Sequence, residues 1–328
     1  MEIYEHFIKP EEDLSKYFSE NNICFLDIET TGLSRKYNQI YLIGLVYFNA
    51  EKNSWCLTQF FASSLNEEEE LLKKFNSFIC DFELLVTYNG ESFDIPFIKY
   101  RSKVYGIDNK TLNIISLDIY RKIKKDNSYL QLENLKLKSI EESLGIYRED
   151  EYSGKDCINL YYQYINTREM IFKQNILKHN YDDLYYLLSI VKIFDTIKDI
   201  KSTAIDLNGH RVDIKVEDIT VDADILKISS STSATYEHIN VIYYEDSFNI
   251  NWQDKANLYV DLEVNEGFIT PTKKCLFINK INFPFNIDLK DLTQYMVPDN
   301  IILLKVEDKY QMENIKNVIK SLILYVIK

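Results

Sequence analysis

Three apolar segments of strand length come before the first helical pattern in this chain of 328 residues. They lie at residues 23–29, 39–49 and 54–62, with the close spacing of antiparallel neighbours. The first contains CFLDIE, whose apolar run is typical of a strand covered on both faces. Residues 66–82 then carry apolar side chains at helical spacing behind an acidic start, which is favourable at a helix N-terminus. Three adjacent strands followed by a helix predict a sheet with an antiparallel part.

The pattern continues with shorter elements up to residue 198. Residues 83–90 predict a short strand, residues 95–105 a helix, and residues 114–120 another strand. The stretch 128–198 is mostly helical in pattern, and its last helix is expected from about residue 170 to residue 198. Together these elements predict an α/β fold in which helices flank a mixed sheet.

A change of pattern near residue 200 predicts a second domain. Short alternating strands follow, separated by turn-forming residues, and an amphipathic helix over roughly 311–326 closes the chain. We therefore expect residues 1–200 to form the α/β domain and residues 201–328 to form a smaller, β-rich C-terminal domain. No motif in the second domain indicates its role.

The composition places the chain among folded, water-soluble proteins. With 46% hydrophobic residues and only 8 Gly and 5 Pro, it can bury a core and is not rich in linkers. No segment approaches the roughly 20 apolar residues that a membrane span needs, and the charged start MEIYEHFIKPEED is unlike a secretory signal. We expect a cytoplasmic protein without membrane contact. The five cysteines include no CxxC pair, which predicts reduced, buried thiols.

The net charge of −13 bears on the kind of partner. Residues 201–328 carry 14 basic and 19 acidic residues, a net of −5, which leaves 24 − 32 = −8 for residues 1–200. This acidity argues against tight, non-specific duplex binding, because duplex binders usually carry a basic surface. It favours transient handling of a 3′ end or a single strand. The basic clusters at 101–103 and 121–125 are either backbone contacts or solvated helix faces.

Asp27 and Glu29 stand two residues apart on the first predicted strand, so both side chains point to one face. Burying two carboxylates costs several kcal/mol unless something pairs with them. A bound metal would compensate for this cost; alternatively, both acids meet solvent at a strand end. The small polar turn Thr30-Thr31-Gly32 that follows would let a nucleotide approach the backbone.

Two further segments carry side chains of the same chemistry. Asp94 follows a strand and the tight Asn89-Gly90 turn, near a helix start where it could also be an ordinary cap. His179 and Asp183 are four residues apart on a helix and hence on one face, as in a simple ion pair. The pKa of a free histidine, about 6.5, suits a base that takes a proton from water.

Taken together, these five residues predict metal-dependent hydrolysis of phosphodiesters. Mg²⁺ and Mn²⁺ bind through oxygen ligands, and carboxylates supply both the oxygens and the neutralising charge. Two such ions about 3.5–4 Å apart can clamp the attacking and leaving oxygens of a phosphodiester.

The motifs DIETTGL, YNGESFDIPF and HNYDDL resemble, in this order, the three exonuclease motifs of the DEDD superfamily. These are the DnaQ-like 3′–5′ exonucleases of the ribonuclease H fold. Within that superfamily the chain is most similar to the YprB-type ribonuclease H-like proteins. The resemblance covers roughly residues 20–198, so it implies a ribonuclease H-like exonuclease domain with this core.

The resemblance also implies roles for individual residues. It makes Asp27, Glu29, Asp94 and Asp183 ligands of two Mg²⁺ or Mn²⁺ ions, with His179 activating or orienting water. The residues expected to line the site of the 3′-terminal nucleotide are Thr30, Thr31, Gly32, Leu33 and Asn89. One departure concerns the last motif: a histidine occupies the spacing at which one branch of the superfamily has tyrosine.

Three functions follow as hypotheses. The first is a two-metal 3′–5′ exonuclease acting on DNA or RNA. The second is a structure-specific endonuclease that uses the same chemistry. The third is a nuclease-derived protein that binds nucleic acid or assists assembly with little turnover. The sequence does not identify protein partners, the preferred sugar or the pathway.

Overall fold

The computed structural model describes eight stretches of the chain, which are residues 1–18, 22–108, 114–148, 152–207, 209–233, 240–254, 256–285 and 289–327. Two compact units make up the chain. The N-terminal unit comprises Met1–Lys124 and Leu132–Ile193, and the C-terminal unit comprises Lys125–Gln131 and Phe194–Lys328. A compact unit need not fold on its own, so the domain boundary after residue 200 stays a prediction.

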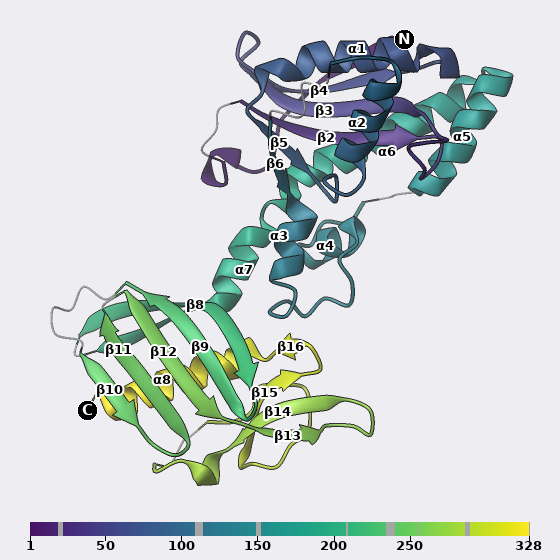
Figure 1. Ribbon diagram of the computed structural model, residues 1–328. Helices are drawn as coiled ribbons and strands as arrows, with labels where there is room; N and C mark the ends of the chain where they lie inside the picture. Colours follow the sequence, from purple (N-terminus) through teal and green to yellow (C-terminus); the bar gives the residue numbers. More distant parts are fainter. Residues whose placement is uncertain are drawn as a thin grey trace. The chain divides into compact units, whose positions relative to one another are not determined.

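The N-terminal unit is built on a six-stranded mixed sheet (Figure 1). Its strands are β1 (Glu2–Ile8), β2 (Ile23–Thr30), β3 (Ile40–Asn49), β4 (Ser54–Phe61), β5 (Leu84–Thr87) and β6 (Ile115–Asp118). They lie in the order β1-β4-β3-β2-β5-β6. The first four pair antiparallel, whereas β5 and β6 run parallel to β2. The predicted mixed α/β architecture is confirmed.

Helices flank this sheet and bury its central strands. They are α1 (Glu68–Phe78), α2 (Asp94–Val104), α3 (Ile119–Lys125), α4 (Leu137–Ser143), α5 (Gly154–Thr167) and α6 (Met170–Ile190). A common core joins apolar side chains of β2 and β3 to α1, α2, α5 and α6. Because α6 packs on β2, β3 and β4, its side chains reach the middle of the sheet.

Two local predictions differ from the structure, and one strand was not predicted. The strand expected over 114–120 ends at Asp118, where the chain turns directly into α3. The long helix expected to residue 198 breaks after Ile190, and α7 (Ile193–Lys201) follows as a separate helix. The charged start of the chain forms β1, an edge strand on β4 whose side chains are mostly exposed or half-buried. An edge strand needs no long apolar run, which is why the apolar pattern did not reveal it.

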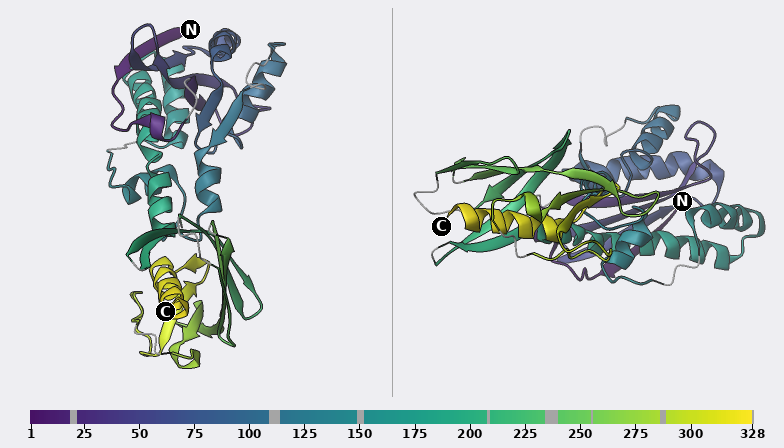
Figure 2. Two further views of the ribbon diagram at one scale, coloured as in Figure 1. Left: turned by 90° about the vertical axis from the view of Figure 1, so that its left-hand side faces the viewer. Right: turned by 90° about the horizontal axis from the view of Figure 1, so that it is seen from below.

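The C-terminal unit consists of two antiparallel sheets and one long helix (Figure 2). The larger sheet holds β7 (Ser202–Leu207), β8 (His210–Asp222), β9 (Ile225–Thr232), β10 (Val241–Tyr244), β11 (Phe248–Asp254) and β12 (Asn257–Glu263). The smaller sheet holds β13 (Asn265–Phe268), β14 (Lys274–Asn279), β15 (Ile301–Val306) and β16 (Lys309–Tyr310). Helix α8 (Met312–Val326) packs its apolar face into a core that includes the fully buried Trp252. The predicted β-rich character is confirmed.

Two general expectations can be compared with the described residues. Four of the five cysteines are buried thiols, but Cys80 is exposed, so the prediction of burial is wrong for Cys80. Cys80 follows α1 at the surface, where nothing packs over it. Among the described helices, none combines the length and apolar character that a membrane span requires.

Candidate active site

Strand β2 carries Asp27 and Glu29 toward helix α6. The amide of Asn180 on α6 donates a hydrogen bond to Asp27 Oδ2 over 2.7 Å. The carboxylate of Glu29 lies beside His179, the residue before Asn180 on that helix, with 3.6 Å between Glu29 Oε1 and His179 Nε2. Both acids therefore point to the same side of the sheet, in line with their spacing along the strand.

A glycine allows the helix to come this close to the sheet. Gly44 on β3 is the register partner of Asp27. A Cβ atom at Gly44 would lie 2.2 Å from Asn180 Oδ1 and 2.5 Å from Leu184 Cδ1. These distances are far inside van der Waals contact, so no other residue fits without displacing the buried side chains of Asn180 and Leu184. The sequence analysis did not identify Gly44 or Asn180, since their importance arises only from this contact.

A chain of hydrogen bonds fixes the direction of the Asn180 amide. Gln59 on β4 donates from Nε2 to Asn180 Oδ1 over 2.8 Å, and to the carbonyl of Leu177 over 2.9 Å. Asn180 is fully buried, so its oxygen needs this donor. Its NH₂ group is thereby left to donate to Asp27, which makes Asp27 an oriented acceptor.

Asp94 joins the two acids of β2 from the first turn of α2. Its Oδ1 accepts a hydrogen bond from the backbone N–H of Ile28, between Asp27 and Glu29, over 3.1 Å. The side chain is 6% exposed. Asp94 is not the N-cap residue of α2, because Phe93 occupies the N-cap position. Burial raises the pKa of Asp94 to about 7.

The acidic side chains influence one another strongly. Burial raises the pKa of Asp27 and of Glu29 well above the usual carboxyl range, and the charges of Asp183 and Asp94 add to this effect. Buried carboxylates with like neighbours resist ionisation together. A divalent cation would offset the repulsion, and a set of carboxylate oxygens suits Mg²⁺ or Mn²⁺. The donor chemistry of this group therefore fits the metals that the sequence predicts.

His179 lies between two of these carboxylates. Its Nε2 atom is 3.6 Å from Glu29 Oε1 and 3.6 Å from Asp183 Oδ2. The imidazole is 8% exposed. Helix α6 thus presents His179 and Asp183 on one face, as their spacing of four residues requires.

Arg148 adds a positive charge that the sequence analysis missed. Its Nη1 atom lies 2.6 Å from Asp183 Oδ1, and its Nε atom lies 2.9 Å from Glu141 Oε2. The guanidinium also lies over the ring of Tyr186, 5.6 Å from its centre. Arg148 stands 35 residues before Asp183 in a segment without a motif, so no sequence signal could have revealed the pair.

Cys157 on α5 is the second unexpected member of the site. Single donor atoms of Glu29, Cys157 and His179 all lie within 4.8 Å of one another. In the described part of the chain, these residues are the one set of three histidine, cysteine or acidic side chains that meets this distance. The four predicted acidic ligands are thus neighbours that interact, but they do not form an equally tight cluster.

The turn after β2 is held by its own hydroxyl groups. Thr30 donates from Oγ1 to the carbonyl of Gly32 over 2.9 Å, and Thr31 Oγ1 accepts from the N–H of Gln39 over 2.9 Å. Both threonines are buried. Leu33, by contrast, is 84% exposed and free to contact a ligand. The two threonine hydroxyls therefore shape the turn.

Asn89 lies in a second tight turn, with a φ angle of 62°. Its backbone N–H donates to Asp118 Oδ1 over 2.8 Å, and the N–H of Glu91 donates to Asp118 Oδ2 over 3.2 Å. Asp118 is buried at the end of β6. These bonds hold the turn and leave the Asn89 amide group outside it as a candidate substrate contact.

Comparison with known proteins identifies the fold family. The family model RNase_H_2, of the RNase H superfamily, matches residues 24–194. The chain belongs to the RNase H superfamily. The matched region contains all of the residues described above, from β2 to α6. The predicted ribonuclease H fold is thereby confirmed.

Individual relatives agree with this family. The chain is 28% identical to the uncharacterized protein YprB of Bacillus subtilis over 179 residues, which are 54% of this chain and 42% of YprB. It is 43% identical to a DNA polymerase of Methanocaldococcus jannaschii over 44 residues, 13% of this chain and 3% of the polymerase. The chain therefore spans less than half the length of either relative. The predicted likeness to YprB is confirmed.

A solved structure also matches part of the chain. The family B DNA polymerase from Pyrobaculum calidifontis matches with a TM-score of 0.42 and 14% identity. The match covers 53% of this chain and 24% of the polymerase.

Proposed function

We propose that this protein is a metal-dependent 3′–5′ exonuclease that hydrolyses phosphodiester bonds of DNA or RNA. The observation that carries the proposal is the meeting of Asp27, Glu29, Asp94 and Asp183 on adjacent elements of an RNase H-like sheet. Burial, together with the charges of the neighbouring acids, raises the pKa of Asp27 and Glu29 well above the usual carboxyl range. Such an arrangement is costly unless cations bind there.

The four carboxylates would hold two Mg²⁺ or Mn²⁺ ions. When bound, such ions stabilise the attacking and leaving oxygens of the phosphodiester. The protein's own contribution is to hold the acids in place. Ile28 donates its backbone N–H to Asp94, and Asn180 donates its amide to Asp27. Partners of this kind orient ligands and tune their affinity.

His179 is the proposed general base or water-orienting group. A neutral imidazole can take a proton from water at a pH near its pKa. The Nε2 atom of His179 lies 3.6 Å from a carboxylate oxygen of Glu29 and 3.6 Å from one of Asp183, so the imidazole stands beside the proposed metal ligands.

The substrate end would meet the two turns beside the acids. Leu33 is exposed next to the Thr30-Thr31-Gly32 turn, so its side chain can pack against a terminal base. The Asn89 amide can donate to the strand from the opposite turn. Since the chain carries a net charge of −13, a short 3′ end is a more suitable partner than a long duplex.

The direct experiment uses end-labelled and circular substrates. The full-length protein is incubated with 5′-labelled single- and double-stranded DNA and RNA, in Mg²⁺, in Mn²⁺ or in EDTA. The proposal predicts a ladder that shortens from the 3′ end and requires the metal. Cleavage of circular DNA would instead favour a structure-specific endonuclease. Binding without cleavage of any substrate would favour the nuclease-derived binding protein.

A further inference from the structure

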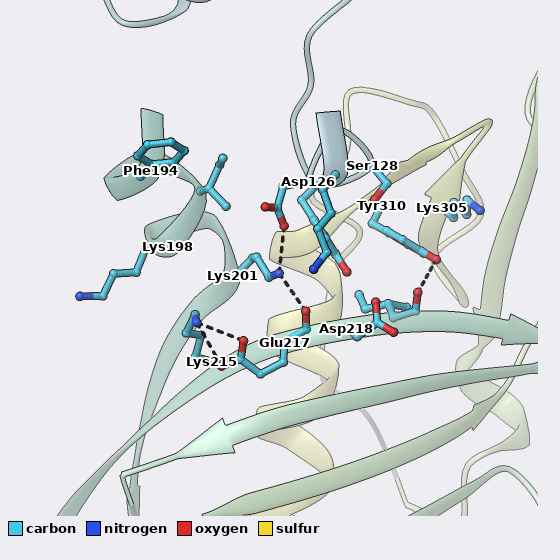
Figure 3. Close-up of a pocket in the computed structure, with 14 residues that line it drawn as sticks. Asp126, Ser128, Phe194, Lys198, Lys201, Lys215, Glu217, Asp218, Lys305 and Tyr310 are labelled. Atoms are coloured by element: carbon cyan, nitrogen blue, oxygen red, sulfur yellow. Dashed lines mark hydrogen bonds and ion pairs between the residues drawn. The ribbon is translucent and has the colours of Figure 1, made fainter. Parts of the chain in front are cut away.

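A hollow of about 500 Å³ lies within the C-terminal unit (Figure 3). Its walls come from the segment Lys125–Gln131, from helix α7, from strand β8 and from the neighbouring strands β15 and β16. This volume falls in the range of small-molecule sites, roughly 300–1,000 Å³. The RNase H family match ends at residue 194, and nine of the fourteen lining residues lie beyond it.

The lining of the hollow is basic although the chain around it is acidic. Residues 201–328 have a net charge of −5. The charged residues of the lining, in contrast, are five lysines and three acids, namely Lys125, Lys198, Lys201, Lys215, Lys305, Asp126, Glu217 and Asp218. A local reversal of sign concentrates anions at that place.

Two of these lysines are already neutralised by neighbours. Lys201 Nζ lies 3.2 Å from Asp126 Oδ1 and donates to the carbonyl of Glu217 over 2.9 Å. Lys215 Nζ lies 3.1 Å from both carboxylate oxygens of Glu217. Figure 3 shows both sets of contacts as dashed lines.

The remaining lysines have no such neutralising acid. Within the described part of the chain, Lys125, Lys198 and Lys305 form no ion pair, and Asp218 is the one acid of the lining left to oppose them. The hollow therefore has a surplus of two positive charges. Lys198 and Lys305 stand at opposite margins of it (Figure 3).

Stacked aromatic rings give the hollow a fixed floor. The rings of Tyr129 and Tyr310 stack with centres 5.6 Å apart, and Tyr310 donates its hydroxyl to the carbonyl of Ile219 over 3.0 Å. The ammonium of the buried Lys201 lies 4.3 Å from the centre of the Tyr129 ring. That of Lys305 lies 5.0 Å from the Tyr310 ring. Such contacts preorganise a site, so that binding orders few side chains.

One wall of the hollow is apolar. Phe194 is half-buried on α7, and Ile197 stands one turn further along the same helix. Ser128 adds a hydroxyl group that can donate to an anion. The combination of unpaired cations, a hydroxyl and an aromatic face suits a ligand with a charged phosphate and a flat ring.

We propose that this hollow binds the phosphate groups of a nucleotide, either free in solution or at the end of a nucleic-acid strand. Lys125, Lys198 and Lys305 supply the charge, and Phe194 supplies the surface for the ring. The proposal does not rest on the nuclease function, because binding is measured without hydrolysis.

Binding is tested with the full-length protein in EDTA, so that neither metal binding nor cleavage contributes. The probes are inorganic phosphate, thymidine monophosphate and a short 5′-labelled oligothymidylate, followed by calorimetry or fluorescence anisotropy. The K125Q/K198Q/K305Q variant is expected to lose about tenfold or more in affinity, because three phosphate contacts disappear. For the oligonucleotide, the slope of log affinity against log salt should fall by about 2.

The matched control is K227Q/K273Q/K274Q, which removes the same charge from the same unit outside the hollow. A second test variant, K125E/K198E, changes exposed residues only and leaves the tyrosine floor intact. If the lysine substitutions weaken the binding of thymidine monophosphate, the ligand is a free nucleotide. If they weaken the binding of the oligonucleotide and the mononucleotide does not bind, the ligand is a strand end. Equal affinity of the wild type and both test variants, or an equal loss in the control, would overturn the proposal.

Discussion

The amide of Asn180 donates a hydrogen bond to Asp27 Oδ2 over 2.7 Å and links helix α6 to strand β2 at the centre of the site. The bond joins residues 153 positions apart in the chain. Because Gln59 fixes the amide oxygen, the Asn180 donor can point in one direction only. The position of the Asp27 carboxylate is thus set by a buried network that begins on β4.

Replacement of Asn180 by alanine should therefore weaken the metal site. N180A removes the donor to Asp27 and leaves the Gln59 amide without one of its acceptors. Loss of an outer partner of a metal ligand commonly costs about 10–100-fold in metal affinity or activity. Calorimetric titration with Mn²⁺ measures the effect. N175A is the control, since Asn175 lies on the same helix and bonds Tyr152 instead; equal losses in both variants would contradict a specific role.

Replacement of Gly44 by alanine should destabilise the N-terminal unit. The new Cβ would approach Asn180 Oδ1 and Leu184 Cδ1 to 2.2 Å and 2.5 Å, which forces these buried side chains to shift. Overpacking of this kind costs about 1–3 kcal/mol in the free energy of unfolding. Urea unfolding gives the value. The control is G154A, at a position where a Cβ meets nothing within 4 Å. Unchanged stability of G44A would show that the contact is not tight.

The metal-free protein should lose stability as the pH rises toward neutrality. Burial raises the pKa of Asp94 from 3.8 to about 7. Protonated Asp94 therefore favours the folded state fully below about pH 4, and this contribution is lost as the pH rises through about 7. A bound cation favours the deprotonated carboxylate instead. The stabilisation of the fold by Mn²⁺ should therefore increase over the same pH range. Melting temperatures in EDTA and in Mn²⁺ across this pH range test both trends. D94N should weaken the trends without abolishing them, because the pKa values of Asp27 and Glu29 are raised as well. A flat wild-type profile would refute the explanation.

Replacement of His179 by alanine should slow catalysis while leaving substrate binding intact. A positioned general base commonly contributes about 10²–10⁴-fold in rate. We expect that loss in kcat with little change in KM. A decrease of less than about threefold would remove His179 from the role of base.

Much of the site could be predicted because its residues belong to local patterns. Asp27 and Glu29 share a face through strand periodicity, and His179 and Asp183 share one through helical periodicity. The turns after β2 and β5 could be recognised from Gly32 and Gly90. These features depend on residues that are close together along the chain, so they can be predicted from the sequence alone.

The rest of the site depends on contacts between distant segments. Gln59 and Asn180 meet across 121 positions, and Arg148 meets Asp183 across 35. Cys157 joins the site only because α5 packs beside α6. Asn180 stands in the HNYDDL motif, but Gln59, Arg148 and Cys157 stand in none of the three motifs, and polar side chains on helices are usually solvated. The same limit explains the break between α6 and α7, where helical propensity continues but the chain passes into the other unit.

The central claim is that the acidic group holds the catalytic metals. It is tested most directly by comparing wild type, D183N and D182N for shortening of a 5′-labelled strand in Mn²⁺. Asp182 is the control because it is adjacent to Asp183 on α6 but pairs with Lys178. We predict shortening from the 3′ end by wild type and D182N, and a loss of more than about 100-fold in D183N. Equal activity of D183N and D182N would contradict the account.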